Sequence, residues 1–540
     1  MKIALAQLNY TIGDFIGNAE KIIQSIQEAR ENKANLIVFS ELSVCGYPPD
    51  DLLDYPHFIH QCIDSLNSIA QHTIGITAIV GCPTLNKEEK GRRLLNSACI
   101  LTNGKWVNTV SKTLLPTYDV FSEARYFQSN EEFQCIEING VKMAITICED
   151  LWDEMDFFSY KQDPLKLLSQ HQPLLIINLS ASPYNSGKEK TRFEILKNQC
   201  LQFNLPMVYV NQVGAHTDLI FDGNSYYINN DGTIGLELPP FQESLQYIDT
   251  SIANTSQDNF YEDRIEGLYN ALVFGIKDYF RKMNFKTVVL GSSGGIDSAL
   301  VQTLASHAIG AENVTAILMP SKFSSEGSVS DAEQLSKNLN NAYHVIPIKE
   351  IYDSYENTLS SVFQGLPFDV TEENIQARSR AVILMAYSNK KGNILLNTSN
   401  KSEMAVGYST LYGDMCGSLS VIGDVYKTDV YQLVNYINKK QEIIPWSIIN
   451  KPPSAELRPN QKDSDSLPDY SVLDAILKLY IEECKSAQNI IESGYEQMVV
   501  EKVIKLVNRN EYKRFQAPPI LRVSSKAFGR GRVIPLVSKW

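Results

Sequence analysis

A short glycine- and serine-rich loop constrains the fold of this chain more than any other feature. It reads Gly291-Ser292-Ser293-Gly294-Gly295-Ile296-Asp297-Ser298 and lies between a buried-type strand at 286–290 and a helical pattern that continues from Ala299. Glycines let the backbone approach a ligand closely, and N–H groups at the start of a helix bind anions. The loop therefore predicts a phosphate site in a strand–loop–helix unit. A plain turn before a helix capped by Asp297 is the structural alternative.

The surroundings of the loop indicate a parallel sheet. No lysine follows the last glycine, so the loop is not of the Walker A kind, and the carboxylate of Asp297 is suited to binding Mg²⁺ beside phosphates. Further strands are expected at 314–320 and 343–348, with a helix at 331–339 between them. This alternation predicts an open parallel sheet with right-handed crossovers.

The first half of the chain also alternates strands and helices. Strands are expected at 2–8, 35–40, 77–82, 97–102, 141–148, 174–179 and 207–211, with a helix at 18–31 and a hairpin at 221–234. Such interleaving favours a layered α/β architecture. Residues 238–262 are polar and turn-rich, without sustained periodicity, so we place the domain boundary there and expect domains at 1–250 and 251–540.

Composition excludes several classes of protein. A length of 540 residues at roughly 150 per domain predicts two to four domains, and the net charge of −13 argues against a nucleic-acid partner. No apolar run approaches the roughly 20 residues of a membrane helix, so no membrane partner is expected. The nine cysteines contain no CxxC pair. We therefore expect a soluble protein of a reducing compartment, the cytoplasm.

Four further segments of the second half extend the signal of the loop. They are, in order, 374–380 (NIQARSR), 397–403 (NTSNKSE), 412–414 (YGD) and 426–428 (YKT). With the loop, they resemble the NAD synthetases among the ATP pyrophosphatases. The resemblance implies a Rossmann-like parallel sheet and ATP-dependent adenylation of the nicotinate carboxylate of deamido-NAD⁺, after which ammonia displaces AMP. It also implies a homo-oligomer, at least a dimer, with its nucleotide site at the subunit interface.

The same resemblance assigns ligands to individual residues. It implies ATP binding by the eight loop residues 291–298 with Thr398 and Lys427, Mg²⁺ binding by Asp297 and Glu403, and deamido-NAD⁺ binding by Asn374, Arg378, Glu403 and Lys513. Metal and cations suit the negative charge that develops at phosphorus. Alone, each residue has an ordinary alternative, such as Arg378 exposed on a helix. Leu411 departs from the family, since ammonia-only synthetases carry a lysine there.

Three predicted strand ends in the first half carry reactive side chains. Glu41 follows the strand at 35–40, Lys112 follows the segment Val110-Ser111, and Cys148 ends the strand at 141–148. A thiol with a pKa near 8.5 needs a base and a positive neighbour to attack at neutral pH. Together these three groups predict an amide-cleaving site. The alternatives are a buried core thiol and a structural ion pair.

These segments resemble the nitrilase superfamily, which implies an αββα sandwich. The resemblance implies that Cys148 is the nucleophile that forms a thioester, Glu41 the general base and Lys112 the group that stabilises the oxyanion. It also implies a glutamine site formed by Tyr118, Glu149, Ser182 and Lys188. A Glu and a Tyr suit an α-ammonium group, and a Lys suits an α-carboxylate.

The two halves explain each other, and over nearly the whole chain they resemble the glutamine-dependent NAD synthetases. Ammonia released at Cys148 must then reach the second site without gaining a proton, so we expect a buried, largely apolar channel and coupled sites. Two alternatives stay open. One is another pyrophosphate-loop amidotransferase, although no suitable histidine accompanies Cys148; the other is a nucleotide-sensing protein with decayed sites.

Overall fold

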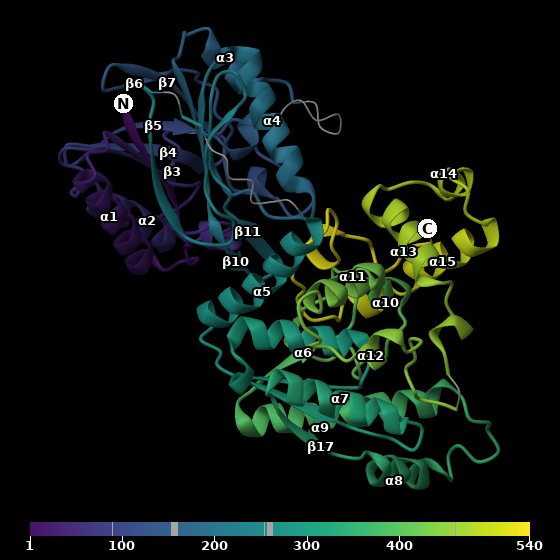
Figure 1. Ribbon diagram of the computed structural model, residues 1–540. Helices are drawn as coiled ribbons and strands as arrows, with labels where there is room; N and C mark the ends of the chain where they lie inside the picture. The colour runs from purple at the N-terminus through teal and green to yellow at the C-terminus, as the bar shows by residue number, and fades with distance from the viewer. Residues whose placement is uncertain (89, 153–159, 253, 256–262, 460, 540) are drawn as a thin grey trace. The chain divides into compact units, whose positions relative to one another are not determined.

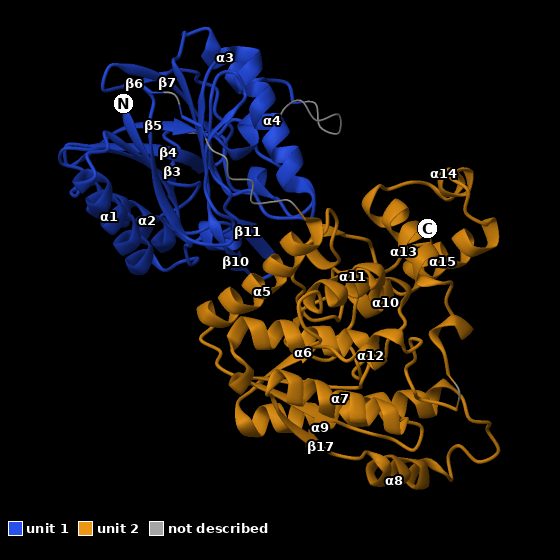
Figure 2. Ribbon diagram, in the orientation of Figure 1, with its two compact units in different colours: residues 1–262 blue, residues 263–540 orange. Residues whose placement is uncertain are grey.

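The computed structural model describes residues 1–88, 90–152, 160–252, 254–255, 263–459 and 461–539. The chain divides into two compact units, 1–262 and 263–540 (Figure 2). The domain boundary that we placed after residue 250 from the sequence lies twelve residues before the boundary between these units, within the segment 238–262. The last linker residues, 256–262, lie outside the described residues. Each unit is considered by itself below.

Unit 1 contains two six-stranded sheets. The first has the order β14-β1-β2-β3-β4-β5, with strands Ser244–Asp249, Lys2–Gln7, Leu36–Val38, Thr77–Leu85, Leu94–Thr102 and Lys105–Ser111. The second has the order β13-β12-β9-β8-β7-β6, with strands Ile234–Glu237, Tyr226–Ile228, Met207–Asn211, Leu175–Ser180, Val141–Ile147 and Ile136–Ile138. Each sheet is parallel at its centre and antiparallel toward its edges.

Helices cover the outer faces of these sheets (Figure 1). Helices α1 (Phe15–Glu31) and α2 (Pro56–Ala70) pack on the first sheet, and α3 (Pro164–Ser169) and α4 (Lys188–Phe203) on the second. The period-2 alternation of a strand explains the layers, because Ile3 and Leu5 lie in the core between the sheets while Ala4 and Ala6 face the helices. The predicted αββα sandwich is confirmed.

Two details of unit 1 differ from the sequence prediction. The linker at 238–262 was expected to be irregular, but it contains β14, which pairs antiparallel with β1. This edge strand is mostly half-exposed and Ile248 is its only buried residue, so it lacks a strong apolar pattern. The predicted hairpin at 221–234 is formed by β12 and β13, whereas Phe221 belongs to an earlier hairpin of β10 (Val213–His216) and β11 (Leu219–Asp222).

Unit 2 is built on a five-stranded parallel sheet, as predicted. Its order is β17-β16-β15-β18-β19, with strands Ala342–Val345, Val314–Leu318, Val288–Gly291, Ile394–Asn397 and Leu419–Ser420. The chain adds strands on one side of β15 and then returns to add β18 on the other. The carboxyl ends of β15 and β18 therefore flank a topological switch point, the usual ligand position in such sheets.

Twelve α-helices are described in unit 2. They are α5 (Arg264–Lys282), α6 (Ile296–Ile309), α7 (Glu326–Leu339), α8 (Lys349–Leu359), α9 (Val370–Lys391), α10 (Lys401–Val406), α11 (Lys427–Ile437), α12 (Trp446–Asn450), α13 (Tyr470–Leu477), α14 (Ala487–Glu492), α15 (Gln497–Arg509) and α16 (Glu511–Arg514). The helix expected at 331–339 begins earlier, because the Ser325 hydroxyl caps it by accepting from the Ser328 N–H at 3.1 Å.

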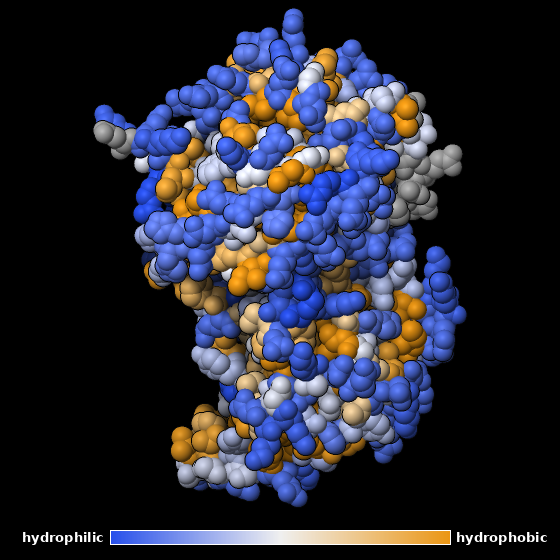
Figure 3. All heavy atoms as spheres, turned by 90° about the vertical axis from the view of Figure 1, so that its left-hand side faces the viewer, coloured by the Kyte–Doolittle hydropathy of each residue, from blue (hydrophilic) through white to orange (hydrophobic). Residues whose placement is uncertain are grey.

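The surface is mainly polar. Figure 3 shows one face on which hydrophilic side chains dominate and apolar ones occur in small groups. Within the described ranges, none of the helices combines the length and the apolar character needed to cross a bilayer.

Candidate active sites

Unit 1 brings a lysine and a glutamate together at strand ends. Glu41 lies just beyond β2, and Lys112 follows β5 directly. The Lys112 Nζ donates to Glu41 Oε1 at 2.8 Å, and both side chains are fully buried. Asn96 Nδ2 donates to the same oxygen at 2.7 Å, and the Ala181 N–H donates to Glu41 Oε2 at 3.1 Å. These contacts fix the carboxylate in one orientation.

A second carboxylate, which the sequence did not indicate, contacts the same lysine. Glu123 Oε1 accepts from Lys112 Nζ at 2.8 Å and from the Tyr47 hydroxyl at 2.8 Å. Burial alone would lower the pKa of Lys112, but the carboxylates of Glu123 and Glu41 outweigh it and hold that pKa well above its usual value. Lys112 is therefore a permanent cation. Glu123 lies on a short 3-10 helix rather than at a strand end, so no pattern marked it.

Cys148 lies directly after β7, where a 3-10 helix begins (Cys148–Leu151). Its φ of 42° is in the left-handed region, which a residue with a side chain adopts only under strain. Burial and the nearby Glu41 raise the pKa of the Cys148 thiol to about 12, although Lys112 opposes them. The thiol is therefore neutral at physiological pH and needs a base when it attacks. Burial, partly opposed by Lys112, raises the pKa of Glu41 to about 7, which suits that role.

Asp150 joins the segments that carry Lys112 and Cys148. Its Oδ1 accepts from the N–H groups of Thr113 at 3.0 Å and Leu114 at 2.8 Å, directly after Lys112. Its Oδ2 accepts from the Ile147 N–H at 3.0 Å, directly before Cys148. The carboxylate is buried and thereby fixes the two strand ends relative to each other. Asp150 lies two residues after Cys148 in the sequence, but its partners could not be read from the sequence.

Of the four residues predicted to bind glutamine, Tyr118 and Glu149 contact each other, whereas Lys188 and Ser182 have other neighbours. Tyr118 donates to Glu149 Oε1 at 3.0 Å, and Tyr160 donates to the same oxygen at 2.9 Å. Lys188 begins α4, with its Nζ 5.1 Å from the centre of the Trp152 ring. The Ser182 N–H donates to Asn211 Oδ1 at 2.8 Å, while its buried hydroxyl has no hydrogen-bond partner in the described part of the chain.

Unit 2 contains a cavity of about 300 Å³ at the switch point of its sheet. The glycine-serine loop lines it, as do Thr398, Glu403 and Lys427. Gly294 has a φ of +76°, and a Cβ there would lie 2.1 Å from the Ser328 carbonyl oxygen, so only glycine fits between the loop and α7. The loop N–H groups, the start of α6 and the cavity together form a site for a phosphorylated ligand.

Two carboxylates and a lysine meet at the edge of this cavity. Lys427 Nζ is ion-paired with Asp297 Oδ2 and lies 3.5 Å from Glu403 Oε1. Burial and the neighbouring Asp297 raise the pKa of Glu403 to about 8, against the effect of Lys427. Among the described residues no three metal-binding side chains cluster. Two carboxylates nevertheless fit Mg²⁺, which commonly takes one or two carboxylates and completes its shell with phosphate oxygens and water.

The other three residues predicted to bind deamido-NAD⁺ surround the segment 407–411 rather than the cavity. Thr410 donates to Asn374 Oδ1 at 2.7 Å, and Arg378 Nε donates to the Leu411 carbonyl at 3.2 Å. Lys513 Nζ donates to the carbonyls of Gly407 at 2.8 Å and Ser409 at 2.7 Å. The three side chains thus hold one loop from two helices that are far apart in the sequence, α9 and α16.

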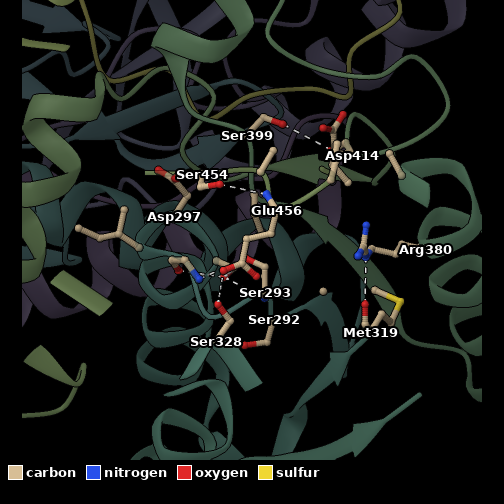
Figure 4. Close-up of a pocket in the computed structure, with 18 of the residues that line it drawn as sticks. Ser292, Ser293, Asp297, Met319, Ser328, Arg380, Ser399, Asp414, Ser454 and Glu456 are labelled. Atoms are coloured by element: carbon tan, nitrogen blue, oxygen red, sulfur yellow. Dashed lines mark hydrogen bonds between the residues drawn. The ribbon is translucent and has the colours of Figure 1, made fainter. Parts of the chain in front are cut away.

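Sequence reasoning missed three charged residues of the cavity wall, of which Figure 4 labels Arg380 and Glu456. Arg380 Nε donates to the Met319 carbonyl at 3.0 Å, and burial lowers the pKa of Arg380 to about 10. On the other side of the view, Glu456 accepts from the Ser328 hydroxyl at 2.7 Å and lies 3.3 Å from Lys451 Nζ. Arg380 stands in the quoted string NIQARSR, whereas Glu456 and Lys451 lie in the segment 451–468, which is rich in Pro, Ser and Asp and carries no recognisable motif.

Comparison with known proteins covers both units. The carbon-nitrogen hydrolase family model matches residues 2–259, and the NAD synthase model matches residues 268–517. Two relatives are the glutamine-dependent NAD(+) synthetases of Synechocystis sp., 45% identical over 99% of this chain and 98% of the relative, and of Acinetobacter baylyi, 43% identical over 100% and 98%. The solved structure of glutamine-dependent NAD+ synthetase from Acinetobacter baumannii in complex with ADP is 40% identical, with a TM-score of 0.79, over 100% of this chain and 99% of that one.

Proposed function

The chain belongs to the glutamine-dependent NAD(+) synthetase family, and on that premise we propose which of its residues perform each half of the reaction. It is a ligase with a fused glutaminase and synthetase. Glutamine is hydrolysed to glutamate and ammonia. ATP adenylates the carboxylate of deamido-NAD⁺ and releases pyrophosphate, and the ammonia then displaces AMP to give NAD⁺.

Cys148 is the nucleophile of the glutaminase in this proposal. As its Sγ bonds to the side-chain amide carbon of glutamine, the thiol proton passes to Glu41, whose pKa near 7 leaves much of it ionised at neutral pH. The Lys112 ammonium donates to the oxyanion. Because Glu41 and Glu123 hold it at 2.8 Å on two sides, it needs no reorganisation as charge develops. Glu41 returns the proton to the leaving nitrogen, which breaks the C–N bond and leaves a thioester.

Hydrolysis of the thioester uses the same groups. Glu41 takes a proton from a water molecule, whose oxygen attacks the thioester carbon, and the proton returns to Sγ as glutamate leaves. For recognition of glutamine, Glu149, held by Tyr118 and Tyr160, is suited to the α-ammonium group. Lys188 is suited to the α-carboxylate. The free hydroxyl of Ser182 offers a further hydrogen bond.

ATP occupies the cavity of unit 2 in this proposal. The N–H groups of 291–298 bind its phosphates, Thr398 adds a hydroxyl, and Lys427 is a cation beside them. Asp297 and Glu403 would hold Mg²⁺, which when bound neutralises phosphate charge and favours departure of pyrophosphate. Asn374, Arg378 and Lys513, around 407–411, would bind deamido-NAD⁺ together with Glu403. Arg380 in the cavity wall supplies another positive charge.

Oligomerisation and the transfer of ammonia complete the proposal. The connection between α8 and α9 and the start of α9 expose apolar side chains, with Val362 and Leu366 each 71% accessible and Val370 60%. Such a patch supports assembly into a homo-oligomer. Ammonia passes through an apolar channel, so that it is not protonated on the way. All nine cysteines are free, which suits a cytoplasmic enzyme.

The observation that carries this proposal is that one chain contains two sites. One is the buried Glu41–Lys112 ion pair near Cys148, and the other is a cavity lined by a loop suited to binding phosphate. The test is incubation with ATP, Mg²⁺, deamido-NAD⁺ and glutamine. AMP, pyrophosphate and NAD⁺ should appear in equal amounts and glutamate in at least that amount, and ATP with deamido-NAD⁺ should accelerate glutamate release if the sites are coupled. Nucleotide binding without AMP formation would instead indicate a nucleotide-sensing protein. AMP formation only with another carboxylate or a nucleotide base as substrate would indicate a different amidotransferase.

A further inference from the structure

Asn400 is a fully buried residue directly before α10, and it hydrogen-bonds to both acidic residues of the synthetase site, using its side chain and its backbone N–H. Its Oδ1 accepts from the Glu403 N–H at 2.9 Å, which caps the helix. Its Nδ2 donates to Asp297 Oδ1 at 3.1 Å. The Glu403 carboxylate in turn accepts from the Asn400 N–H at 3.3 Å. One short side chain therefore joins two acidic residues that are far apart in the sequence.

We propose that Asn400 is a positioning residue that holds the Asp297 and Glu403 carboxylates at a fixed separation, ready to bind a divalent cation between protein and phosphate. This inference rests on the proposed function, in which those two carboxylates bind Mg²⁺. Asp297 comes from α6 after β15, and Glu403 from α10 after β18, on the two sides of the switch point. Two like charges from separate segments repel, so their spacing needs a bridge between the segments.

The chemistry of an amide suits this task. Asn offers a donor and an acceptor on one short side chain, whereas Asp offers only acceptors and Lys only donors. Because it is neutral, Asn400 orients Asp297 and leaves its negative charge available to a cation. Lys427 occupies the other oxygen of Asp297, so both carboxylate oxygens have partners and the side chain has one orientation.

The neighbouring residue makes the position of Asn400 rigid. Lys401 is fully buried, and its Nζ lies 3.0 Å from Asp424 Oδ1 and 2.9 Å from Glu482 Oε1. It also donates to the Ser524 hydroxyl at 2.6 Å. This network holds the start of α10 to the C-terminal segment. A change limited to the Asn400 side chain should therefore alter the contact with Asp297 without moving the helix.

The discriminating variant is Asn400→Ser. Serine is as good an N-cap as asparagine, but it is too short to reach Asp297 and adds no charge. The measurement is the affinity for ADP by calorimetry, with and without Mg²⁺. In the unaltered protein Mg²⁺ should strengthen ADP binding, and Asn400→Ser should reduce that strengthening by tenfold or more. Metal-free ADP affinity, melting temperature and glutamate release should stay as they were.

Two controls separate the possible outcomes. Asp369→Ser replaces the cap of α9, whose capping box has the same form but lies in an exposed position, and should leave the Mg²⁺ effect intact. Asp297→Asn should abolish it. If Mg²⁺ has no effect on ADP binding by the unaltered protein, the proposed metal role of Asp297 and Glu403 is wrong. If Asp297→Asn removes the effect and Asn400→Ser keeps it, only the role of Asn400 is overturned.

A second variant is used if Asn400→Ser melts at a lower temperature than the unaltered protein. Asn400→Asp keeps the cap and places a carboxylate against Asp297, so it must also change the Mg²⁺ effect. An unchanged effect overturns the proposal.

Discussion

Lys112 and Glu41 form an ion pair that is completely inaccessible to solvent, with Nζ 2.8 Å from Oε1. A pair of this kind costs desolvation energy and is retained only where both charges have further partners. Here Glu123 is a second partner for the lysine, and Asn96 and the Ala181 N–H for the glutamate. The pair is therefore structural and also prepared for chemistry, because it presents a base and a cation beside Cys148.

Glutamate release should depend on pH through Glu41. A carboxylate acts as a base only when it is ionised, and the pKa of Glu41 is about 7. The rate of glutamate release should therefore be low below pH 7 and should rise as the pH increases through 7. Glu41→Gln should reduce the rate by roughly 10²- to 10⁴-fold above pH 7, and by less at lower pH, where Glu41 of the unaltered protein is itself protonated. Glutamate release measured from about pH 5 to about pH 9 checks both statements. A flat profile across neutrality, or a Gln variant with normal rate, would contradict the assignment.

Gly294→Ala should destroy the nucleotide site. Both the φ of +76° and the 2.1 Å approach of an added Cβ to the Ser328 carbonyl oppose any side chain. Gly392→Ala is the matched control, since Gly392 has a φ of +73° but nothing within 4 Å of its Cβ. We expect the control to cost about 1 kcal/mol of stability and to bind ADP normally. Calorimetry compares the ADP affinities of the two variants. Equal affinities would show that the close approach of residue 294 to the Ser328 carbonyl is unimportant for nucleotide binding.

Arg192→Met should destabilise unit 1 strongly. The guanidinium is fully buried, with Nη2 2.5 Å from Asp222 Oδ2, so its removal leaves a buried carboxylate without its partner. Loss of about 3–5 kcal/mol in the free energy of unfolding is expected. Lys197→Met, on the same helix, removes a partly exposed 3.5 Å contact with Glu194 and should cost less than about 1 kcal/mol. Urea unfolding of both variants makes the comparison, and similar losses would refute the burial argument.

Removal of divalent cations should separate the two reactions. With a chelator present, AMP and pyrophosphate formation should stop, because Asp297 and Glu403 then face the phosphates without a divalent metal ion. Basal glutamate release should continue, since Glu41, Lys112 and Cys148 need no metal in the proposed steps. Added Mg²⁺ should restore AMP formation. Persistent AMP formation without metal, measured by chromatography, would argue against the role of the two carboxylates.

Much of the fold could be predicted from the sequence, since it depends on local patterns. The central strands, such as β9 and β16, are continuous apolar runs, and the glycine-serine loop fixes a strand–loop–helix unit. The edge strand β14 was missed because only one of its side chains is buried.

The candidate sites were predictable where a residue stands in a motif, and not where long-range packing selects it. Glu123 reaches Lys112 from a short 3-10 helix, and Glu456 reaches Ser328 from a segment 128 residues away in the chain. Asp150 follows Cys148 closely and Asn400 stands inside a quoted string, yet their partners depend on where separate strands end in the fold, for Asp150 strands of two different sheets. Such contacts follow from topology, which periodicity alone does not specify.

The most direct test of the whole account is NAD⁺ formation by Cys148→Ala, measured once with glutamine and once with an ammonium salt as the nitrogen source. The account predicts that glutamine-driven formation is lost while ammonia-driven formation continues at the rate of the unaltered protein. Loss of both activities, or survival of the glutamine-driven one, would contradict two separate sites in which Cys148 releases the nitrogen.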